Sequence, residues 1–338
     1  MRHILFALCI VTAAPAFAND GFGGLSATGL TFGQTEAVAM ETEDLFISPT
    51  RIEVAYTFRN LTDQDVTGEV IFPLPPISLE ALTSSDWNLP EEAGRDDLLG
   101  FTASVEGKPV AVSIDRIAVI EPEWDPTRPI AAQYDTPGRD VTAALEAAGV
   151  PLSVDIGAVQ AELLALPEDQ RNALEAAGLV DFVDGEAWPH WAVVIRYHWT
   201  QTFPAGARLK VAHGYDHRPP GGIFAWAHPP AEGWTAELAA QYCIDDSTSS
   251  GIMKRLARPD GEGSYGSAQY IDYVLRTANS WAGPIGQFRL TLDKGSERNI
   301  ISLCADGIKK TGPTTFVWER ENFTPQRDLS ILIVSPFE

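Results

Sequence analysis

The sequence YTFRNLTDQDVTGEVIFPLPP, Tyr56 to Pro76, carries the pattern that decides the fold. It continues an alternation of apolar and mostly polar residues that begins near residue 50, with apolar members Ile52, Val54, Tyr56 and Phe58. A period of two is typical of a half-buried β-strand. The polar residues from 60 to 65 predict a turn, and residues 66 to 74 predict a second strand.

Two prolines at the end of the second predicted strand raise the question of why the strand stops there. Pro73 and Pro75 are two residues apart, so the N–H groups they lack would point to the same side of the strand. This confines the segment to a sheet edge or a strand end. Either the edge is kept open for a partner, or the chain leaves the sheet. We favour the second interpretation because prolines usually protect edges from pairing.

Further along the chain, β patterns enclose a helical one. Strands are predicted at 98–105 and 110–120, with a turn at Glu106-Gly107-Lys108. From about 140 to 184 the chain is rich in Ala, Leu and Glu, and Gly149 and Gly178 are suited to end helices. Strands resume at 191–215. This pattern predicts a helical insertion within a β domain.

The segment 219–234 contains two Pro-Pro pairs and a Gly-Gly pair, and it predicts a connection between two domains. The first domain would cover 19–218. The second, 235–338, would begin with short helices at 235–243 and 247–257 and continue with five strands at sandwich-like spacing. We therefore expect a mainly β fold of two sandwich-like β domains, the first with an α-helical insertion at about 140–184.

The spacing of the histidines raises the hypothesis of a metal site. His213 and His217 are four residues apart, which on a strand separates them by about 13 Å, too far to share one ion. If strands 191–203 and 208–215 formed a hairpin, one register would place His198 opposite His213. The alternative register pairs Trp199 with His213 and builds one apolar face, and register follows the buried pattern. We expect a packed His213, no metal site and no cofactor.

The N-terminus has the pattern of a secretory signal peptide, residues 1–18. Arg2 and His3 precede an apolar run, and Ala16-Phe17-Ala18 is a small-x-small cleavage pattern, so we expect cleavage near Ala18. No other stretch is long and apolar enough for a spanning helix. These features predict an exported protein, periplasmic or secreted, that does not span the membrane.

The net charge limits the classes of binding partner, and the cysteine count predicts a disulfide. The formal net charge is −22, which disfavours nucleic acid and anionic membrane surfaces. After cleavage only Cys243 and Cys304 remain, and two cysteines in an exported chain usually pair. We expect a Cys243–Cys304 disulfide.

Several segments carry a resemblance to a known family. The sequences ETEDLFISPTRIEVAYTFRN, VIFPLP, YHWTQTFPAG, QYCID, WAGPIGQFRLTLDKG and NFTPQRDL resemble a family of exported bacterial proteins known as domain of unknown function DUF 4424. The resemblance spans nearly all of the mature chain. YTFRN, FPLP and GFTASVEGKPV, within residues 52–112, are also similar to the opening of the vault/inter-alpha-trypsin (VIT) domain, which implies protein interaction. Neither resemblance implies catalytic residues.

Tryptophans in Pro- or Gly-rich connections are the candidates for a recognition surface, because aromatic side chains suit sugar or protein binding. They are Trp124, Trp188, Trp226 and Trp234. No Gly-x-Ser-x-Gly elbow is present, and no spacing joins a general acid to a base, so we predict no catalytic residues.

The function expected from the sequence is a non-catalytic binding or assembly module of the cell envelope, with an envelope protein or glycan as partner. This hypothesis rests partly on analogy with the VIT domain. One alternative is an envelope glycan hydrolase that uses acidic residues near Trp124 or at Asp245 and Asp246. A second alternative is a soluble binder of metal cations.

Overall fold

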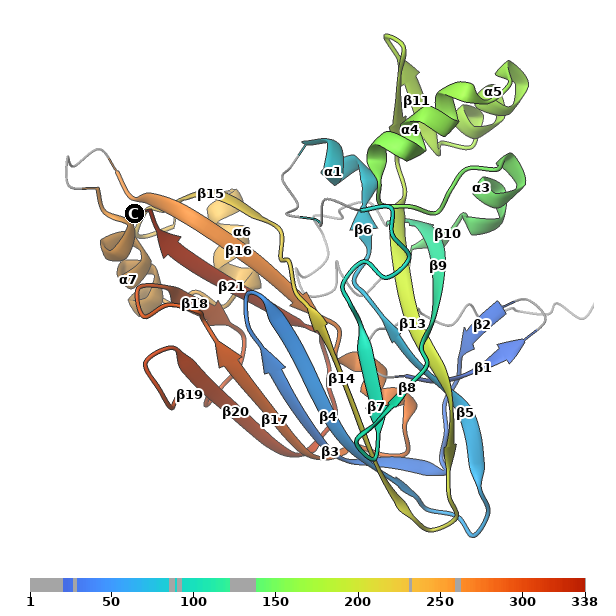
Figure 1. Cartoon of the computed structure of the whole chain (residues 1–338). Helices are drawn as coiled ribbons and strands as arrows, with labels where there is room; N and C mark the ends of the chain where they lie inside the picture. The colour runs from blue at the N-terminus through green and yellow to red at the C-terminus, as the bar shows by residue number, and fades with distance from the viewer. Residues whose placement is uncertain are drawn as a thin grey trace, which may run out of the picture.

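The computed structural model describes residues 21–26, 29–84, 89, 93–121, 138–230, 233–258 and 263–337. The fold is mainly β, as predicted, with three sheets of seven, eight and four strands, a two-stranded ribbon and several short helices (Figure 1). Among the described residues, no helix has both the length and the apolar character needed to cross a membrane.

The seven-stranded sheet forms one side of the N-terminal half. Its main path, in spatial order, is β10 (Arg139–Asp140), β9 (Ser113–Ile120), β13 (Ala192–Phe203), β5 (Val66–Pro73), β1 (Gly21–Ser26) and β2 (Gly29–Phe32). The seventh strand, β6 (Ile77–Ser78), pairs with β13 just beyond the end of β5. The long strand β13 therefore organises this sheet.

The eight-stranded sheet combines strands from both ends of the chain. Its order is β19 (Lys309–Lys310), β20 (Thr315–Phe323), β17 (Ile285–Asp293), β3 (Val38–Ile47), β4 (Arg51–Asn60), β14 (Arg208–Asp216), β7 (Thr102–Val105) and β8 (Lys108–Val110). The four-stranded sheet has the order β15 (Gly221–Ala225), β16 (Tyr265–Tyr273), β21 (Leu329–Pro336) and β18 (Ile300–Leu303). The eight-stranded sheet thus links the two halves of the chain.

The two strands of the opening sequence do not pair with each other. β4 pairs with β14 in the eight-stranded sheet, whereas β5 pairs with β13 in the seven-stranded sheet. The predicted hairpin between β13 and β14 is wrong, because β13 pairs with β5 and β14 pairs with β4. Both turns cross between sheets and lie together, since Asn60 Nδ2 donates to the carbonyl of Phe203 at 2.8 Å. The apolar faces of β4 and β14 therefore lie across the core from the apolar faces of β5 and β13.

Aromatic rings fill the space between these two sheets. Phe58 contacts Phe203 with ring centroids 5.6 Å apart, and Phe72 contacts Tyr215 at 5.3 Å. His213 is 4% exposed and packs against Phe72 with ring centroids 4.5 Å apart. The predicted packing of His213 is confirmed, although it lies opposite Val54 rather than Trp199.

The prolines lie where β5 ends. Leu74 N donates to the carbonyl of Ile195 on β13 at 2.8 Å, so the neighbouring Pro73 and Pro75 would direct their missing donors away from β13. The sheet partner on that side, β1, extends only to Ile71. The prediction of a strand end is confirmed, and the chain briefly returns to β13 as β6.

The helical insertion is present between β10 and β13. It consists of α3 (Thr142–Ala148), α4 (Ile156–Ala165), α5 (Glu168–Ala176) and the ribbon of β11 (Val180–Val183) and β12 (Glu186–Pro189). Gly149, with φ 73°, caps α3 in the left-handed conformation, as its position after the apolar run predicted. Leu145, Val159 and Leu163 attach the insertion to the main core.

The second half contributes strands to two sheets: it forms the whole four-stranded sheet, and it adds β17, β19 and β20 to the eight-stranded sheet. β17 pairs in parallel with β3, and one hydrophobic cluster contains Phe72, Tyr215 and Ile331, from all three sheets. The connection at 219–234 leads into the four-stranded sheet, whose other face carries a smaller cluster with Phe224, Trp226 and Leu332, while the main cluster spans both halves. Helices α6 (Trp234–Gln241) and α7 (Asp246–Leu256) cover the other face of the four-stranded sheet (Figure 1).

The predicted disulfide is present. Cys243, just after α6, bonds to Cys304, just after β18. The bond closes a loop with a sequence separation of 61 residues. It ties the helical cover to the four-stranded sheet at the edge opposite β15.

Candidate functional site

The structure does not bring the four candidate tryptophans together. Trp188 on β12 is 38% exposed and Trp234 at the start of α6 is 55% exposed. Figure 1 places β11, the strand paired with β12, and α6 on opposite parts of the molecule. Trp124 lies outside the described residues. Trp188 and Trp234 therefore do not share a surface, and each stays a separate prediction.

Trp226 is a correction to the predicted surface. It is only 4% exposed, it stacks on Phe224 with ring centroids 5.5 Å apart, and its Nε1 donates to Ser249 Oγ at 3.0 Å. Trp226 follows β15 directly, and the α7 side of the four-stranded sheet buries it. The Pro- and Gly-rich context suggested an exposed loop, whereas the ring belongs to the core beneath the helices.

Of the acidic residues considered for hydrolysis, those directly beside Trp124 lie outside the described residues, whereas Asp245 and Asp246 are described. Asp245 caps α7, because its Oδ1 accepts the backbone N–H of Thr248 at 2.7 Å. This hydrogen bond holds the pKa of Asp245 below its ordinary value. Asp246 is exposed, with Oδ1 3.7 Å from His228 Nε2. In the described part of the chain, no three His, Cys, Asp or Glu residues lie close enough to hold a metal ion.

A cleft opens where the three sheets meet, and both proline-rich segments of the sequence line it. Its volume is about 130 Å³. Pro75 and Pro76 lie between β5 and β6, and Pro219 and Pro220 lie between β14 and β15. The remaining apolar wall comes from Leu74, Ile77, Leu89, Leu98 and Leu99. Because Pro has no N–H, these segments can line the cleft without exposing unpaired donors.

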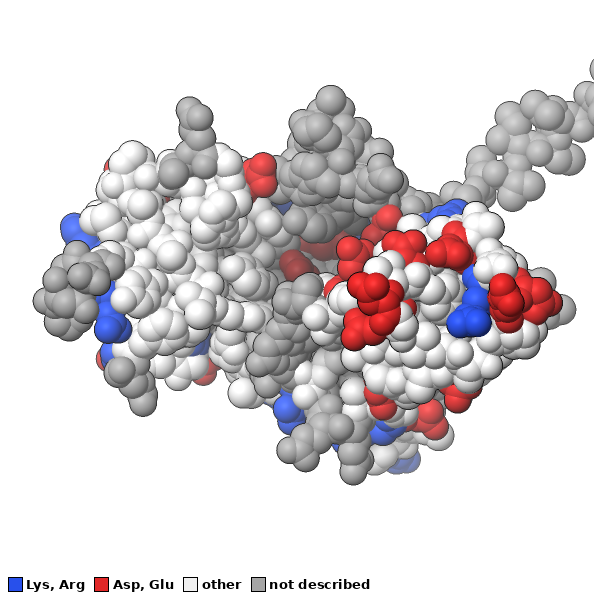
Figure 2. Space-filling view, turned by 90° about the horizontal axis from the view of Figure 1, so that it is seen from above, with Lys and Arg blue, Asp and Glu red and all other residues white. Residues whose placement is uncertain are grey.

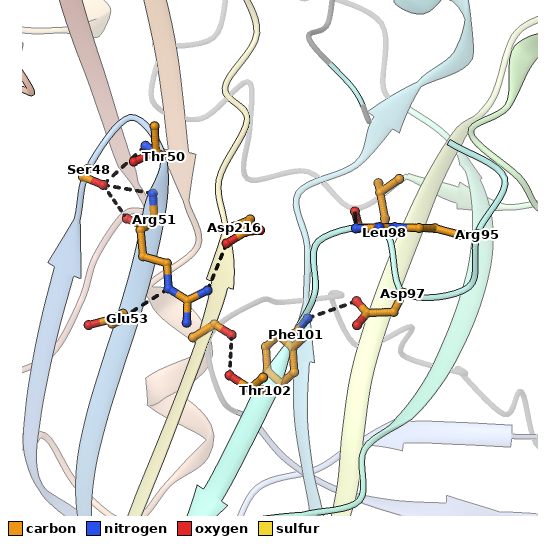
Figure 3. A network of polar contacts seen from close by, with 11 residues as sticks. Ser48, Thr50, Arg51, Glu53, Arg95, Asp97, Leu98, Phe101, Thr102 and Asp216 are labelled. Carbon is orange, nitrogen blue, oxygen red and sulfur yellow. Dashed lines mark hydrogen bonds and ion pairs between the residues drawn. The ribbon is translucent and has the colours of Figure 1, made fainter. Parts of the chain in front are cut away.

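One wall of the cleft is anchored by the turn between β3 and β4 (Figure 3). Ser48 Oγ accepts the N–H of Arg51 at 2.9 Å and donates to its carbonyl at 3.0 Å, which closes the turn. The Arg51 guanidinium then binds Asp216 at 3.1 Å and Glu53 at 3.2 Å. The turn therefore holds the end of β14 in place just before the chain enters the cleft.

The opposite wall is the segment that carries Leu98 and Leu99. Asp97 Oδ1 accepts the N–H of Phe101 at 3.0 Å and the hydroxyl of Tyr197 at 3.1 Å (Figure 3 labels Asp97 and Phe101). Leu99 O accepts the N–H of Asp216 at 2.9 Å. These contacts fix the two leucines against the end of β14, so polar anchors behind the wall position an apolar surface.

Three ionisable groups face the cleft from the connection after β14 and from that strand. His217 Nδ1 lies 3.2 Å from the carbonyl of Ser48, which can only accept, so Nδ1 carries the proton and Nε2 is an acceptor. Burial lowers the pKa of His217 to about 4, so the ring is neutral at pH 7. Burial raises the pKa of Tyr215, and the neighbouring Tyr197 adds to this effect. Arg218 is exposed at the cleft.

The four-stranded sheet contributes Tyr270 and Asp272 to the cleft. They are two residues apart on β16, so their side chains lie on the same face. Asp272 Oδ1 accepts the hydroxyl of Ser330 at 2.8 Å. Asp272 is exposed to the cleft, yet protein surrounds its carboxylate closely enough to raise its pKa, and Asp328 adds to the shift.

Several polar groups of the cleft have no partner within the described ranges. The Tyr215 side chain is 3% exposed, and its hydroxyl makes no hydrogen bond there. The hydroxyl of Tyr270 and the guanidinium of Arg218 are likewise unpaired among the described residues. An apolar cleft with a few unpaired polar groups is the usual form of a small-molecule site. Sequence reasoning missed it because its segments are up to about 200 residues apart; the paired prolines were the available signal.

A larger hollow lies on the outer face of the eight-stranded sheet and is less suited to specific binding. It has a volume of about 640 Å³ and lies over β3, β17 and β20. Two of its charged residues, Arg289 and Glu319, pair with each other at 3.8 Å. The cleft is therefore the stronger candidate site.

Acidic side chains gather over the helical insertion (Figure 2). The exposed ones are Glu146, Glu162, Glu168, Asp169, Glu175, Asp181, Asp184 and Glu186. Arg171 is the one arginine or lysine between residues 141 and 189. This distribution concentrates negative potential on one part of the molecule.

The fold and site define a mainly β protein with an apolar cleft at the junction of its three sheets. The chain belongs to the family described as Domain of unknown function (DUF4424), whose model matches residues 18–332. Among solved structures, the chain is similar to a Legionella pneumophila protein described as a candidate nutrient binding protein. The identity is 15%, the TM-score is 0.44, and the match covers 93% of this chain and 72% of that one. No curated protein shows significant similarity to the chain.

Proposed function

We propose that this protein is a non-catalytic binding module of the bacterial cell envelope and that its ligand occupies the cleft. The observation that carries the proposal is the set of unpaired polar groups on Tyr215, Tyr270 and Arg218 in an apolar surface. These groups are open to the cleft, because none of their polar atoms is among the buried unpartnered atoms of the described residues. A bound ligand would hydrogen bond to them in place of water.

Features of the chain favour the envelope as its location. Arg2, the apolar run after it and Ala16-Phe17-Ala18 form a secretory signal pattern, and we expect cleavage near Ala18. The Cys243–Cys304 disulfide is the kind of bond that persists in oxidising compartments. We propose a periplasmic or secreted protein.

For contact with protein partners we propose a different surface, the ribbon of β11 and β12. The similarity of residues 52–112 to the opening of the VIT domain stays a sequence-based prediction. Trp188, on the exposed face of the β11–β12 ribbon, lies opposite Asp181 and is suited to contact an envelope protein or glycan. The cleft and the ribbon can be tested separately because they share no residue.

The test is to purify the tagged mature protein from intact envelopes, denature it and identify the released small molecules by mass spectrometry. The expected result is one small molecule in near-stoichiometric amount, lost from a Tyr215→Phe/Arg218→Ala variant. The matched control is Tyr265→Phe/Arg298→Ala, which changes the same residue types outside the cleft. Circular dichroism confirms that both variants fold.

Two outcomes would contradict the cleft proposal. One is a released molecule retained equally by the cleft variant. The other is folded wild-type protein that releases nothing and gains no thermal stability from an envelope small-molecule extract. Crosslinking in the same envelopes, with Trp188→Ala alongside, tests the ribbon. A protein partner lost only in Trp188→Ala would place recognition there instead.

A further inference from the structure

We propose that the cleft binds a small zwitterion with an aliphatic body, of the size and chemistry of valine. In this arrangement Arg218 and the hydroxyl of Tyr215 hold the carboxylate, Asp272 holds the ammonium group, and the leucines and prolines contact the side chain. This inference deepens the proposed function and rests on it.

The volume of the cleft limits the size of the ligand. A cleft of about 130 Å³ is close to the roughly 150 Å³ cavity that accommodates benzene in an engineered protein. A body of about six to eight non-hydrogen atoms therefore fits. Lipids and oligosaccharides are too large to enter the cleft as a whole.

The hydrogen-bond donors of the cleft select a carboxylate. Arg218 makes no ion pair in the described part of the chain, and a guanidinium forms two parallel hydrogen bonds to a carboxylate. The hydroxyl of Tyr215, which the described residues leave without a hydrogen bond, can donate to the same carboxylate. Tyr215 is the stronger indication because the rest of its side chain is buried.

The acceptors of the cleft select an ammonium group. Asp272 uses one oxygen to accept from Ser330, and its other oxygen accepts no hydrogen bond from the described residues. Burial disfavours its charged form, and a bound ammonium would restore that form by direct attraction. The unprotonated Nε2 of His217 is a further acceptor on the same cleft.

Net charge separates a zwitterion from a simple carboxylic acid. The chain carries a formal charge of −22, which repels an anion as it approaches. A zwitterion has no net charge and still offers a carboxylate to Arg218. The walls, made of Leu74, Ile77, Leu98, Leu99 and prolines, provide no polar partner for a side chain, which favours an aliphatic one.

The experiment is isothermal titration calorimetry on the full mature chain, refolded from urea with its disulfide intact so that bound molecules are removed. The probes are L-valine, isovalerate, which lacks the amine, and isobutylamine, which lacks the carboxylate. L-valine is expected to bind at least 10-fold more tightly than either analogue, because each analogue leaves one charged group of the cleft without its partner.

Matched variants assign each end of the ligand. Arg218→Gln is expected to weaken L-valine at least 10-fold and to leave isobutylamine unchanged. Asp272→Asn is expected to weaken L-valine and to leave isovalerate unchanged or improved. Arg298→Gln, an exposed arginine outside the cleft, is the control and should bind L-valine as the wild type does.

The results that overturn this inference differ from those that overturn the proposed function. Equal binding of L-valine and isovalerate would show an anion site, and no heat with L-valine at millimolar concentration would exclude the class. In either case a different molecule released from the cleft of native protein would still support the proposed function. L-valine binding that survives both Arg218→Gln and Asp272→Asn would place the ligand elsewhere.

Discussion

At the scale of single residues, the surroundings of a side chain decide its role more than its type does. Trp226 and Trp188 both lie in Pro- or Gly-rich sequence, yet one is buried under α7 and the other is exposed on the ribbon. His213 and His217 are four residues apart, and one packs among aromatic rings while the other hydrogen bonds to Ser48 at the cleft.

The two tryptophans are expected to differ in their contribution to stability. Trp226→Phe removes the hydrogen bond to Ser249 and leaves that buried hydroxyl with one partner fewer, so the free energy of unfolding should fall by about 1 to 3 kcal/mol. Trp188→Phe changes an exposed ring and should alter it by about 0.5 kcal/mol or less. Urea denaturation of both variants measures the difference. Equal losses would contradict the burial of Trp226.

His217 should make stability depend on pH. Its pKa in the folded protein is about 4, below the ordinary value of 6.5, so the unfolded chain takes up the proton first as pH falls. The contribution of the neutral ring is complete above about pH 6.5 and is lost between about 6.5 and 4, by up to about 3 kcal/mol. Carboxylates titrate in part of this range, so the measurement is a comparison with His217→Asn. The variant should lose less stability than the wild type between pH 7 and pH 4.5, and parallel pH curves would refute the prediction.

At the scale of elements, local signals were sufficient to place helices and strands. Gly149 ends α3 with φ 73°, and Asp155 caps α4 by accepting the N–H of Ala158 at 3.1 Å. The strands of the opening sequence lie at 51–60 and 66–73, close to their predicted positions. The pairing of strands was not local, because the turns that follow β4 and β13 cross from one sheet to another.

Two glycines of the helical insertion provide a matched pair. Gly149→Ala places a side chain in the left-handed conformation and should lower the free energy of unfolding by about 1 kcal/mol. Gly157→Ala lies in α4, where the new methyl carbon would be 3.5 Å from Asp155 Oδ1, an ordinary contact, and should raise it by about 0.5 kcal/mol. Thermal denaturation followed by circular dichroism measures both. Changes in melting temperature of the same sign for the two variants would contradict this account of the two helix ends.

At the scale of the whole molecule, one sheet and one hydrophobic cluster join the sequence halves. β3 lies between β4 from its own half and β17 from the other. The cleft depends on this junction, since its lining residues come from strands and connections of all three sheets. The two predicted domains are therefore expected to fold together.

A fragment of residues 219–338 should not fold by itself. It retains β17 and β20 but lacks β3, and the inner faces of its strands lose their packing partners. The full mature chain should unfold in a single transition in urea, whereas the fragment should show no cooperative transition and little strand signal by circular dichroism. A fragment that unfolds cooperatively with native-like near-ultraviolet signals would establish an independent second domain.

The sequence by itself was sufficient for the mainly β class, most strand positions, the helical insertion and the Cys243–Cys304 pair. These follow from periodicity, capping residues and cysteine count, which are properties of neighbouring residues or of composition. Only the tertiary structure decided which strands pair, that Trp226 is buried and that two proline segments meet in a cleft. The physical reason is that alternation determines which face of a strand is apolar but not which partner covers it. That choice depends on the packing of the whole core, as with Phe72 and Tyr215, which are distant in sequence and in contact across the sheets.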